Sequence, residues 1–148
     1  MISVAGRTRG TVVLALGSVI CVLTCCGVLD LVGKANDRQD RRAARAALGG
    51  YLTRVEDGDY LAAYQQLCSD VLEDYPETEH VAFLRQQRAF VSYAIGDPTE
   101  SSGIDGTYLA FPVSLTYVDG SADEIGLVVG LQTDGPKVCD SESWRSGS

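Results

Sequence analysis

The sequence has few of the residues from which metal sites and catalytic centres are usually built. It contains one histidine, His80, and five cysteines, of which only Cys68 and Cys139 follow residue 45. No Cys-x-x-Cys pair with a second ligand pair is present, which argues against a structural zinc site. A catalytic triad would depend on His80 alone, and no phosphate loop of the Walker type occurs. We therefore expect no cofactor, no metal and no catalytic residue, and a protein that is not an enzyme.

Positive charge is also scarce beyond residue 45. Residues 1–45 carry seven Lys or Arg against three Asp or Glu, whereas residues 46–148 carry five against seventeen. An acidic surface repels phosphate backbones, because both carry negative charge. We therefore expect no nucleic-acid partner.

One long hydrophobic run extends from Thr11 to Val32, and its only formal charge is Asp30, near its end. As a helix, this run would span about 33 Å, enough to cross a bilayer core of about 30 Å. A domain of about 100 residues could hardly surround a helix that is apolar on every side. The run therefore predicts a single-pass membrane anchor after a short basic N-terminus (residues 1–10), with the lipid bilayer as a partner.

Two other interpretations of the hydrophobic run stay open. A cleaved signal peptide would end at a small-residue cleavage site, but apolar residues continue to Val32. In a lipoprotein, Leu23-Thr24-Cys25-Cys26 would be the lipobox and Cys26 the acylated residue. Such motifs usually place Gly, Ala or Ser where Cys25 stands.

The charges that flank the run and the cysteines of the domain favour opposite orientations. Only Arg7 and Arg9 precede the run, whereas five cations follow it within residues 33–45, which predicts a cytoplasmic C-terminal domain. A short basic leader before a first hydrophobic segment is, however, the usual form of an export signal, and two cysteines suit an oxidising compartment. We therefore expect the domain to lie outside the cytoplasm.

Residues 33–45 are predicted to form a basic juxtamembrane linker helix, because their cations recur on one helical face. Lys34 and Arg38 are the candidates for contact with lipid headgroups, since cations further along would stand beyond the Debye length of about 8 Å. A solvated linker is the alternative. Gly49-Gly50 could mark the boundary between linker and domain. Apolar residues at helical spacing surround it: Ala44, Leu48, Tyr51, Leu52 and Val55.

Residues 46–140 are predicted to form one α+β domain whose first part is helical. Asp59 can cap an amphipathic helix whose apolar residues continue to Val71 and which Pro76 ends. Thr78 can cap a further helix that reaches about residue 88. His80 lies in the charged start of that helix, where we expect a solvated surface side chain.

Alternating apolar residues beyond residue 89 predict antiparallel strands. Asp119-Gly120 predicts a hairpin, Asp134-Gly135 a turn into a short last strand, and Pro112 an exposed edge or a bulge. We therefore expect about three helices packed on an antiparallel sheet of about four strands, then a tail over residues 141–148. The three predicted inward faces are Val91, Tyr93 and Ile95; Leu109, Phe111, Val113, Leu115 and Tyr117; and Ile125, Leu127, Val129 and Leu131.

Residues 45–140 resemble the nuclear transport factor 2-like, or cystatin-like, superfamily, and within it small exported actinobacterial proteins of unknown function. The residues that carry the resemblance are Gly58-Asp59-Tyr60, Ala63-Tyr64 and Leu67-Cys68, then residues 115–120 and 137–139. The resemblance implies a cone-like domain with a curled sheet, an exported location and a Cys68–Cys139 disulfide. The positions of the two cysteines, on the apolar face of a helix and at the end of the last strand, agree with that pairing.

The resemblance is compatible with two classes of function, because the superfamily holds both pocket enzymes and non-catalytic binding modules. No enzyme motif of the superfamily matches this chain. We predict a membrane-anchored extracytoplasmic module that binds an envelope protein or a small apolar ligand, and a small isomerase or dehydratase is the alternative. Four tyrosines are candidates for the lining of a pocket, although aromatic residues at these spacings are more often core residues: Tyr60, Tyr64, Tyr93 and Tyr117.

Overall fold

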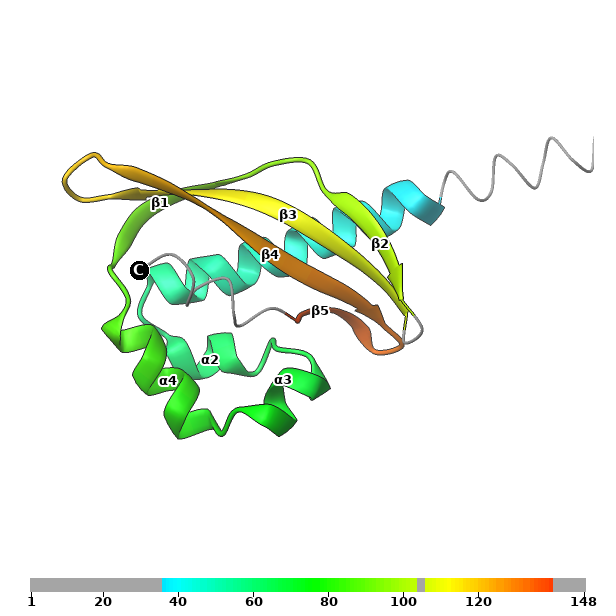
Figure 1. Cartoon of the computed structure of the whole chain (residues 1–148), viewed down its shortest axis with the longest axis horizontal. Coiled ribbons are helices and arrows are strands. Elements are labelled where there is room, and N and C mark those ends of the chain that lie inside the picture. The colour runs from blue at the N-terminus through cyan, green and yellow to red at the C-terminus, as the bar shows by residue number, and fades with distance from the viewer. Residues whose placement is uncertain (1–35, 104–105, 140–148) are drawn as a thin grey trace, which may run out of the picture. The chain divides into compact units, whose positions relative to one another are not determined.

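The computed structural model describes residues 36–103 and 106–139, which form an α+β domain of helices and a curled antiparallel sheet (Figure 1). The predicted anchor, Lys34 and the tail beyond residue 140 lie outside these residues. Within the described ranges, no helix is long and apolar enough to cross a membrane. After a helix over residues 36–56, the elements are α2 (Tyr60–Tyr64), α3 (Ser69–Asp74), α4 (Glu77–Gln86), β1 (Phe90–Ile95), β2 (Thr99–Gly103), β3 (Gly106–Tyr117), β4 (Ala122–Gln132) and β5 (Gly135–Val138).

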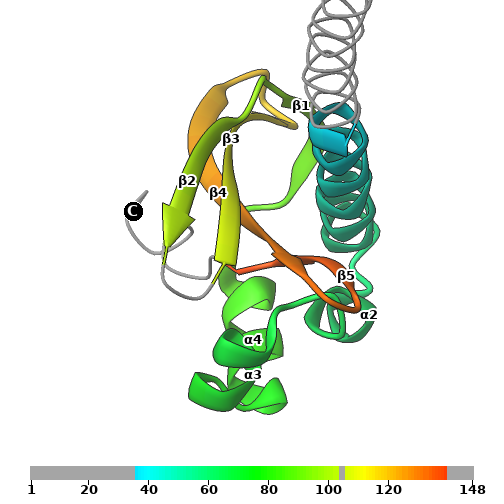
Figure 2. The same ribbon diagram turned by 90° about the vertical axis from the view of Figure 1, so that its right-hand side faces the viewer.

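The helix over residues 36–56, called the long helix below, runs beside the sheet (Figure 2). It continues without a break through Gly49-Gly50, and the compact unit begins at Asp40, ahead of residue 46. The long helix therefore belongs to the domain for most of its described length. Its predicted apolar residues are all buried in the core: Ala44, Leu48, Tyr51, Leu52 and Val55.

The amphipathic helix predicted from Asp59 onward is in fact two short helices, α2 and α3. Asp59 caps α2 as predicted, since its carboxylate accepts a hydrogen bond from the Ala62 amide (3.3 Å). Between the two helices, the Cys68 amide donates to the Val138 carbonyl (2.9 Å) and the Val138 amide donates to the Gln66 carbonyl (3.1 Å). The prediction of one helix was wrong because these backbone groups bond to β5 instead of to the next helical turn.

His80 is buried, with 3% of its surface exposed, so the prediction of a surface histidine was also wrong. It lies on α4 with its ring centroid 5.6 Å from that of Tyr64 and 6.4 Å from that of Phe83. Its acidic neighbours Glu77 and Glu79 are exposed. The charged side chains beside His80 in the sequence are thus exposed although His80 itself is buried, and they did not indicate where the histidine packs.

The sheet has five strands, in the order β1-β3-β4-β5, and β2 pairs with β3 as well. β1 pairs with the second half of β3, where Ile95 lies opposite Val113, and β2 pairs with the first half, where Thr99 lies opposite Ala110. The two strands thus share one side of β3. β2 was not predicted, because its sequence, TESSG, has no apolar alternation.

The inward faces of β3 and β4 are as predicted, and that of β1 differs at one residue. Val91 is 49% exposed, whereas Phe90 is 4% exposed and belongs to the core. The register between β1 and β3 shifts between Phe90 and Ser92, which marks a β-bulge. An extra residue in one strand interrupts the alternation of side chains between the two faces of the sheet. Phe90 therefore packs inward in place of Val91.

Pro112 lies on β3 between the stretches that pair with β1 and β2. Its side chain is exposed, and its carbonyl accepts a hydrogen bond from the Gly96 amide (2.8 Å) in the connection between those strands. A proline has no amide hydrogen to donate on that side. Pro112 therefore occupies the position along β3 where the missing donor interrupts neither β1 nor β2.

Gly96→Ala is expected to lower the free energy of unfolding by about 1–3 kcal/mol, because a Cβ there would overpack the sheet. It would lie 2.7 Å from the Pro112 Cγ, and that ring carbon cannot turn away. Urea denaturation measures the change. Gly126→Ala is the matched control: Gly126 lies opposite Pro112 on β4, and a Cβ there would have nothing within 4 Å. Equal losses for the two variants would contradict the overpacking.

Candidate functional site

The four tyrosines proposed as pocket lining do not gather at one cavity. Tyr93, on β1, donates its hydroxyl to the Gly49 carbonyl of the long helix (3.0 Å). Tyr64 donates to the Tyr75 carbonyl (2.9 Å) and so joins α2 to the end of α3. Tyr60 is partly buried against the core. These side chains fasten elements of the domain to one another.

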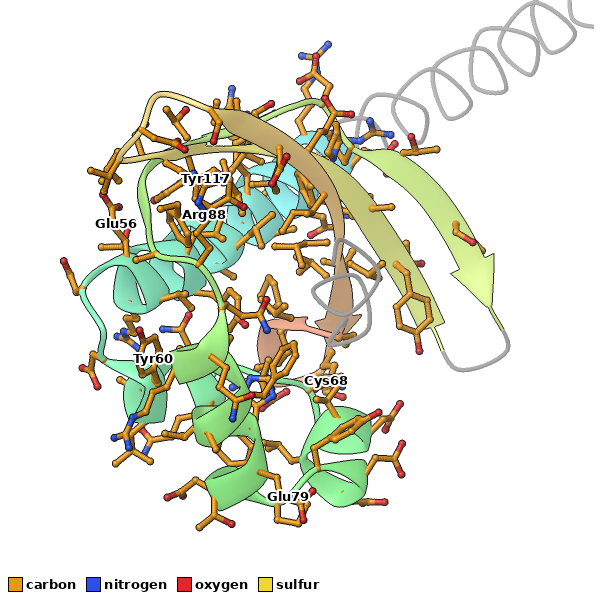
Figure 3. The ribbon with its side chains drawn as sticks, turned by 60° about the vertical axis from the view of Figure 1, so that its left-hand side comes forward. Glu56, Tyr60, Cys68, Glu79, Arg88 and Tyr117 are labelled. Atoms are coloured by element: carbon orange, nitrogen blue, oxygen red, sulfur yellow. The ribbon has the colours of Figure 1, made fainter. Side chains whose placement is uncertain are left out.

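Tyr117 belongs to a small cluster at the hairpin end of the sheet. The Arg88 guanidinium lies over its ring, 4.0 Å from the centroid (Figure 3). It also forms an ion pair with Asp119. Burial, and then the adjacent Asp123, raise the pKa of Tyr117. Hydrogen bonds from the Ser121 hydroxyl and amide, followed by Arg88, lower the pKa of Asp119 to about 2. The cluster thus keeps Tyr117 protonated and Asp119 charged at neutral pH, which suits a structural role better than acid–base catalysis.

Arg45 fastens the long helix to the connection between β1 and β2. Its guanidinium donates to the carbonyls of Ile95 (2.7 Å) and Gly96 (2.8 Å), and it lies 3.0 Å from the Asp97 carboxylate. The guanidinium carbon also lies 6.0 Å from the centre of the Phe111 ring. This cation, which the sequence assigned to a linker, therefore contacts the sheet.

The other cations of the predicted basic stripe have different surroundings. Arg41 forms an ion pair with Glu100 of β2 (3.2 Å). Arg38 is exposed on the long helix, and Lys34 lies outside the described residues. Headgroup contact by Lys34 and Arg38 stays a prediction.

The structure brings Cys68 and Cys139 together. Cys68 is buried where α3 begins, Cys139 follows β5, and the two side chains lie 2.6 Å apart. Burial raises the pKa of the Cys139 thiol to about 12, and the neighbouring Cys68 adds to this effect. Because the thiolate is the reactive form, Cys139 is a poor nucleophile in the folded, reduced protein. The disulfide itself stays a prediction.

A groove of about 370 Å³ lies next to the cysteine pair. Its walls are the first two residues of α3, Ser69 and Asp70, together with residues 106–108 of β3 and 130–132 of β4. The pair lies directly behind these walls: Cys68 precedes Ser69, and a Cβ on Gly130 would lie 2.8 Å from the Cys139 sulfur. Sequence reasoning missed this groove because its walls come from three distant segments, none of which carries a motif.

The groove offers hydrogen-bond acceptors and one negative charge. The residues of its lining carry one carboxylate (Asp70), three hydroxyls (Ser69, Thr107 and Tyr108) and one side-chain amide (Gln132), and they include no Lys, Arg or His. Among the described residues, no group of three or more His, Cys, Asp and Glu could hold a metal ion. The groove is therefore suited to binding a polar or cationic group.

No protein-family model matches the chain, and the comparison with curated proteins finds no match. The resemblance to the nuclear transport factor 2-like superfamily therefore rests on the residues that suggested it.

Proposed function

We propose that the chain is a membrane-anchored module of the nuclear transport factor 2-like kind that binds a partner protein outside the cytoplasm. The observation that carries this proposal is the filled interior of the domain. The space between the long helix and the sheet is occupied by a continuous apolar core to which both contribute, with Leu48, Tyr51 and Phe111 fully buried. A filled core favours recognition at the surface, and so a protein partner over a small apolar ligand held inside.

The same interior argues against the alternative of a pocket enzyme. An isomerase or dehydratase of this kind needs a carboxylate or a histidine at the floor of its pocket. In the described part of the chain, His80 is the one buried residue of the polar and charged types. It packs against the aromatic rings of Tyr64 on α2 and Phe83 on α4, so these ring neighbours come from helices and not from the sheet.

The extracytoplasmic location is supported by the contact between Cys68 and Cys139. Two thiols that meet when the chain folds are converted to a disulfide in an oxidising compartment and remain reduced in the cytoplasm. The anchor is supported by the hydrophobic run at residues 11–32.

Photocrosslinking in intact cells tests this proposal. A photoreactive residue is placed in the full-length chain at Leu61, Val91 or Val118, the large apolar side chains that are exposed in the described part of the domain. These three lie on α2, on β1 and beyond the end of β3, so a docked partner is expected to form a discrete adduct at one or two of them. The adduct should be found in the membrane fraction and be degraded by protease added to spheroplasts.

Two outcomes would contradict the proposal. An adduct that resists external protease until the membrane is opened would place the domain in the cytoplasm. The absence of any adduct at all three positions, with the protein present and folded, would leave no partner at these surfaces and would favour the enzyme.

A further inference from the structure

We propose that the groove between α3 and the ends of β3 and β4 binds one cationic side chain, Lys or Arg, presented by the partner protein. The identity of the partner as a protein rests on the proposed function above, whereas the preference for a cation follows from the groove itself. Its volume of about 370 Å³ is near the lower end of the range for ligand sites, about 300–1,000 Å³. That is room for one long side chain and its immediate neighbours.

The charges in and around the groove favour a cation. Asp70 is the one charged residue in the lining, and it is exposed to solvent. From Glu56 to Leu84 the chain carries eight Asp or Glu and no Lys or Arg, so the helical side of the groove lies in a negative field. Lys137 lies opposite Gly130 in the pairing of β4 with β5. Its ammonium nitrogen is 3.7 Å from the Asp134 carboxylate, and that negative charge offsets the positive charge of Lys137.

The remaining lining suits the donors of an ammonium or guanidinium group. These groups carry three and five N–H donors and no acceptor, so they need several acceptors at once. The hydroxyls of Ser69 and Thr107 and the amide oxygen of Gln132 supply them beside Asp70. The half-buried Tyr108 ring adds an aromatic face of the kind that attracts cations.

The cysteine pair lies beside both sides of this groove. The α3 wall starts at Ser69, directly after Cys68, and the β4 wall includes Gly130, against which the Cys139 sulfur packs. The Cys68 amide also donates a hydrogen bond to the Val138 carbonyl, which joins the start of α3 to β5 next to these walls.

Nuclear magnetic resonance of the full-length chain in zwitterionic micelles tests the inference. The probe is an end-capped tripeptide with a central arginine, and the matched peptide carries citrulline, which has nearly the same shape and no charge. We expect the arginine peptide to shift the amide signals of residues 69–70, 106–108 and 130–132, and the citrulline peptide to shift them far less. Asp70→Asn should weaken binding about fivefold or more, because an ionic hydrogen bond is lost.

Asp74→Asn is the control variant, since Asp74 is an exposed acid on the same helix outside the groove. It should change the affinity less than about twofold, because Asp74 is not part of the lining and forms no ionic hydrogen bond with a side chain held in the groove. Equal effects of the two variants, or equal binding of the citrulline peptide, would overturn the cation site. Tighter binding of a free diamine than of the peptide would overturn the assignment to a partner side chain. None of these results bears on the crosslinking test, whose positions lie outside the groove.

Discussion

The oxidised protein, with a Cys68–Cys139 disulfide, is expected to be about 4 kcal/mol more stable to unfolding than the reduced protein. The bond would close a loop of about 70 residues, and the loss of chain entropy in the unfolded state gives this magnitude. A domain of this size has a total stability of about 5–15 kcal/mol. The disulfide would therefore supply a large part of it, and the reduced domain should be close to unfolding.

This difference should increase with pH in the alkaline range. In the reduced protein, burial raises the pKa of Cys139 well above the ordinary value of a thiol, to about 12, so the folded state favours the protonated thiol. That contribution to stability is fully present below about pH 9 and is lost as the pH rises through about 12. The oxidised protein has no thiol to titrate there, so its stability should fall less over the same range.

Urea denaturation with and without reductant measures the stability difference. A variant with alanine at positions 21, 25 and 26 leaves Cys68 and Cys139 as the only cysteines and is the appropriate background. Alkylation is carried out in denaturant, because the raised pKa of Cys139 would slow labelling of the folded protein even without a disulfide. Labelling of both cysteines without reductant would show that no bond had formed, and a midpoint insensitive to reductant would remove its role in stability.

A fragment that begins at residue 51 is expected not to fold. It lacks Ala44 and Leu48, which are fully buried in the core, and Arg45, which bonds to the β1–β2 connection. Removal of one buried leucine side chain alone costs about 2–5 kcal/mol. Loss of the first half of the long helix also exposes the sheet residues beneath it, and together these losses should exceed the stability of the domain.

A fragment that begins at residue 40 is the control, since the compact unit starts there. Circular dichroism and urea denaturation should show this longer fragment folded and cooperative, and the shorter one without a transition. If both fragments unfolded with the same midpoint, Gly49-Gly50 would be the true start of the domain and the contacts of Arg45 would contribute nothing to stability.

Local features of the sequence were enough to predict β3, β4 and the turn that joins them. The five alternate apolar residues from Leu109 to Tyr117 are all buried, because successive side chains of a strand point to opposite faces and only one face meets the helices. Gly120 takes the positive φ (81°) that the turn needs, and Asp119 accepts hydrogen bonds from Ser121. These features depend on neighbours within a few residues.

Other features of the fold, among them the position of Cys68 at the groove, depended instead on contacts between distant segments. The break between α2 and α3, which places Cys68 at the groove, exists because residues 66 and 68 bond to Val138 of β5. The outward turn of Val91 depends on a bulge in its pairing with β3. The burial of His80 depends on packing against aromatic side chains, among them Tyr64 of α2. None of these partners lies close enough in the sequence to alter the local pattern of apolar residues.

The sequence by itself determined four features of this protein: one apolar stripe along the long helix, two strands of alternating apolar residues, an acidic domain and a pair of cysteines. These properties follow from side-chain spacing and charge, which need no knowledge of the fold. Only the tertiary structure decided that Arg45 binds the sheet and that a groove with Asp70 lies between α3 and the strand ends. The physical reason is that the spacing of apolar residues specifies which face of a helix or strand is buried. The segment against which that face packs depends on the arrangement of all the helices and strands in the fold.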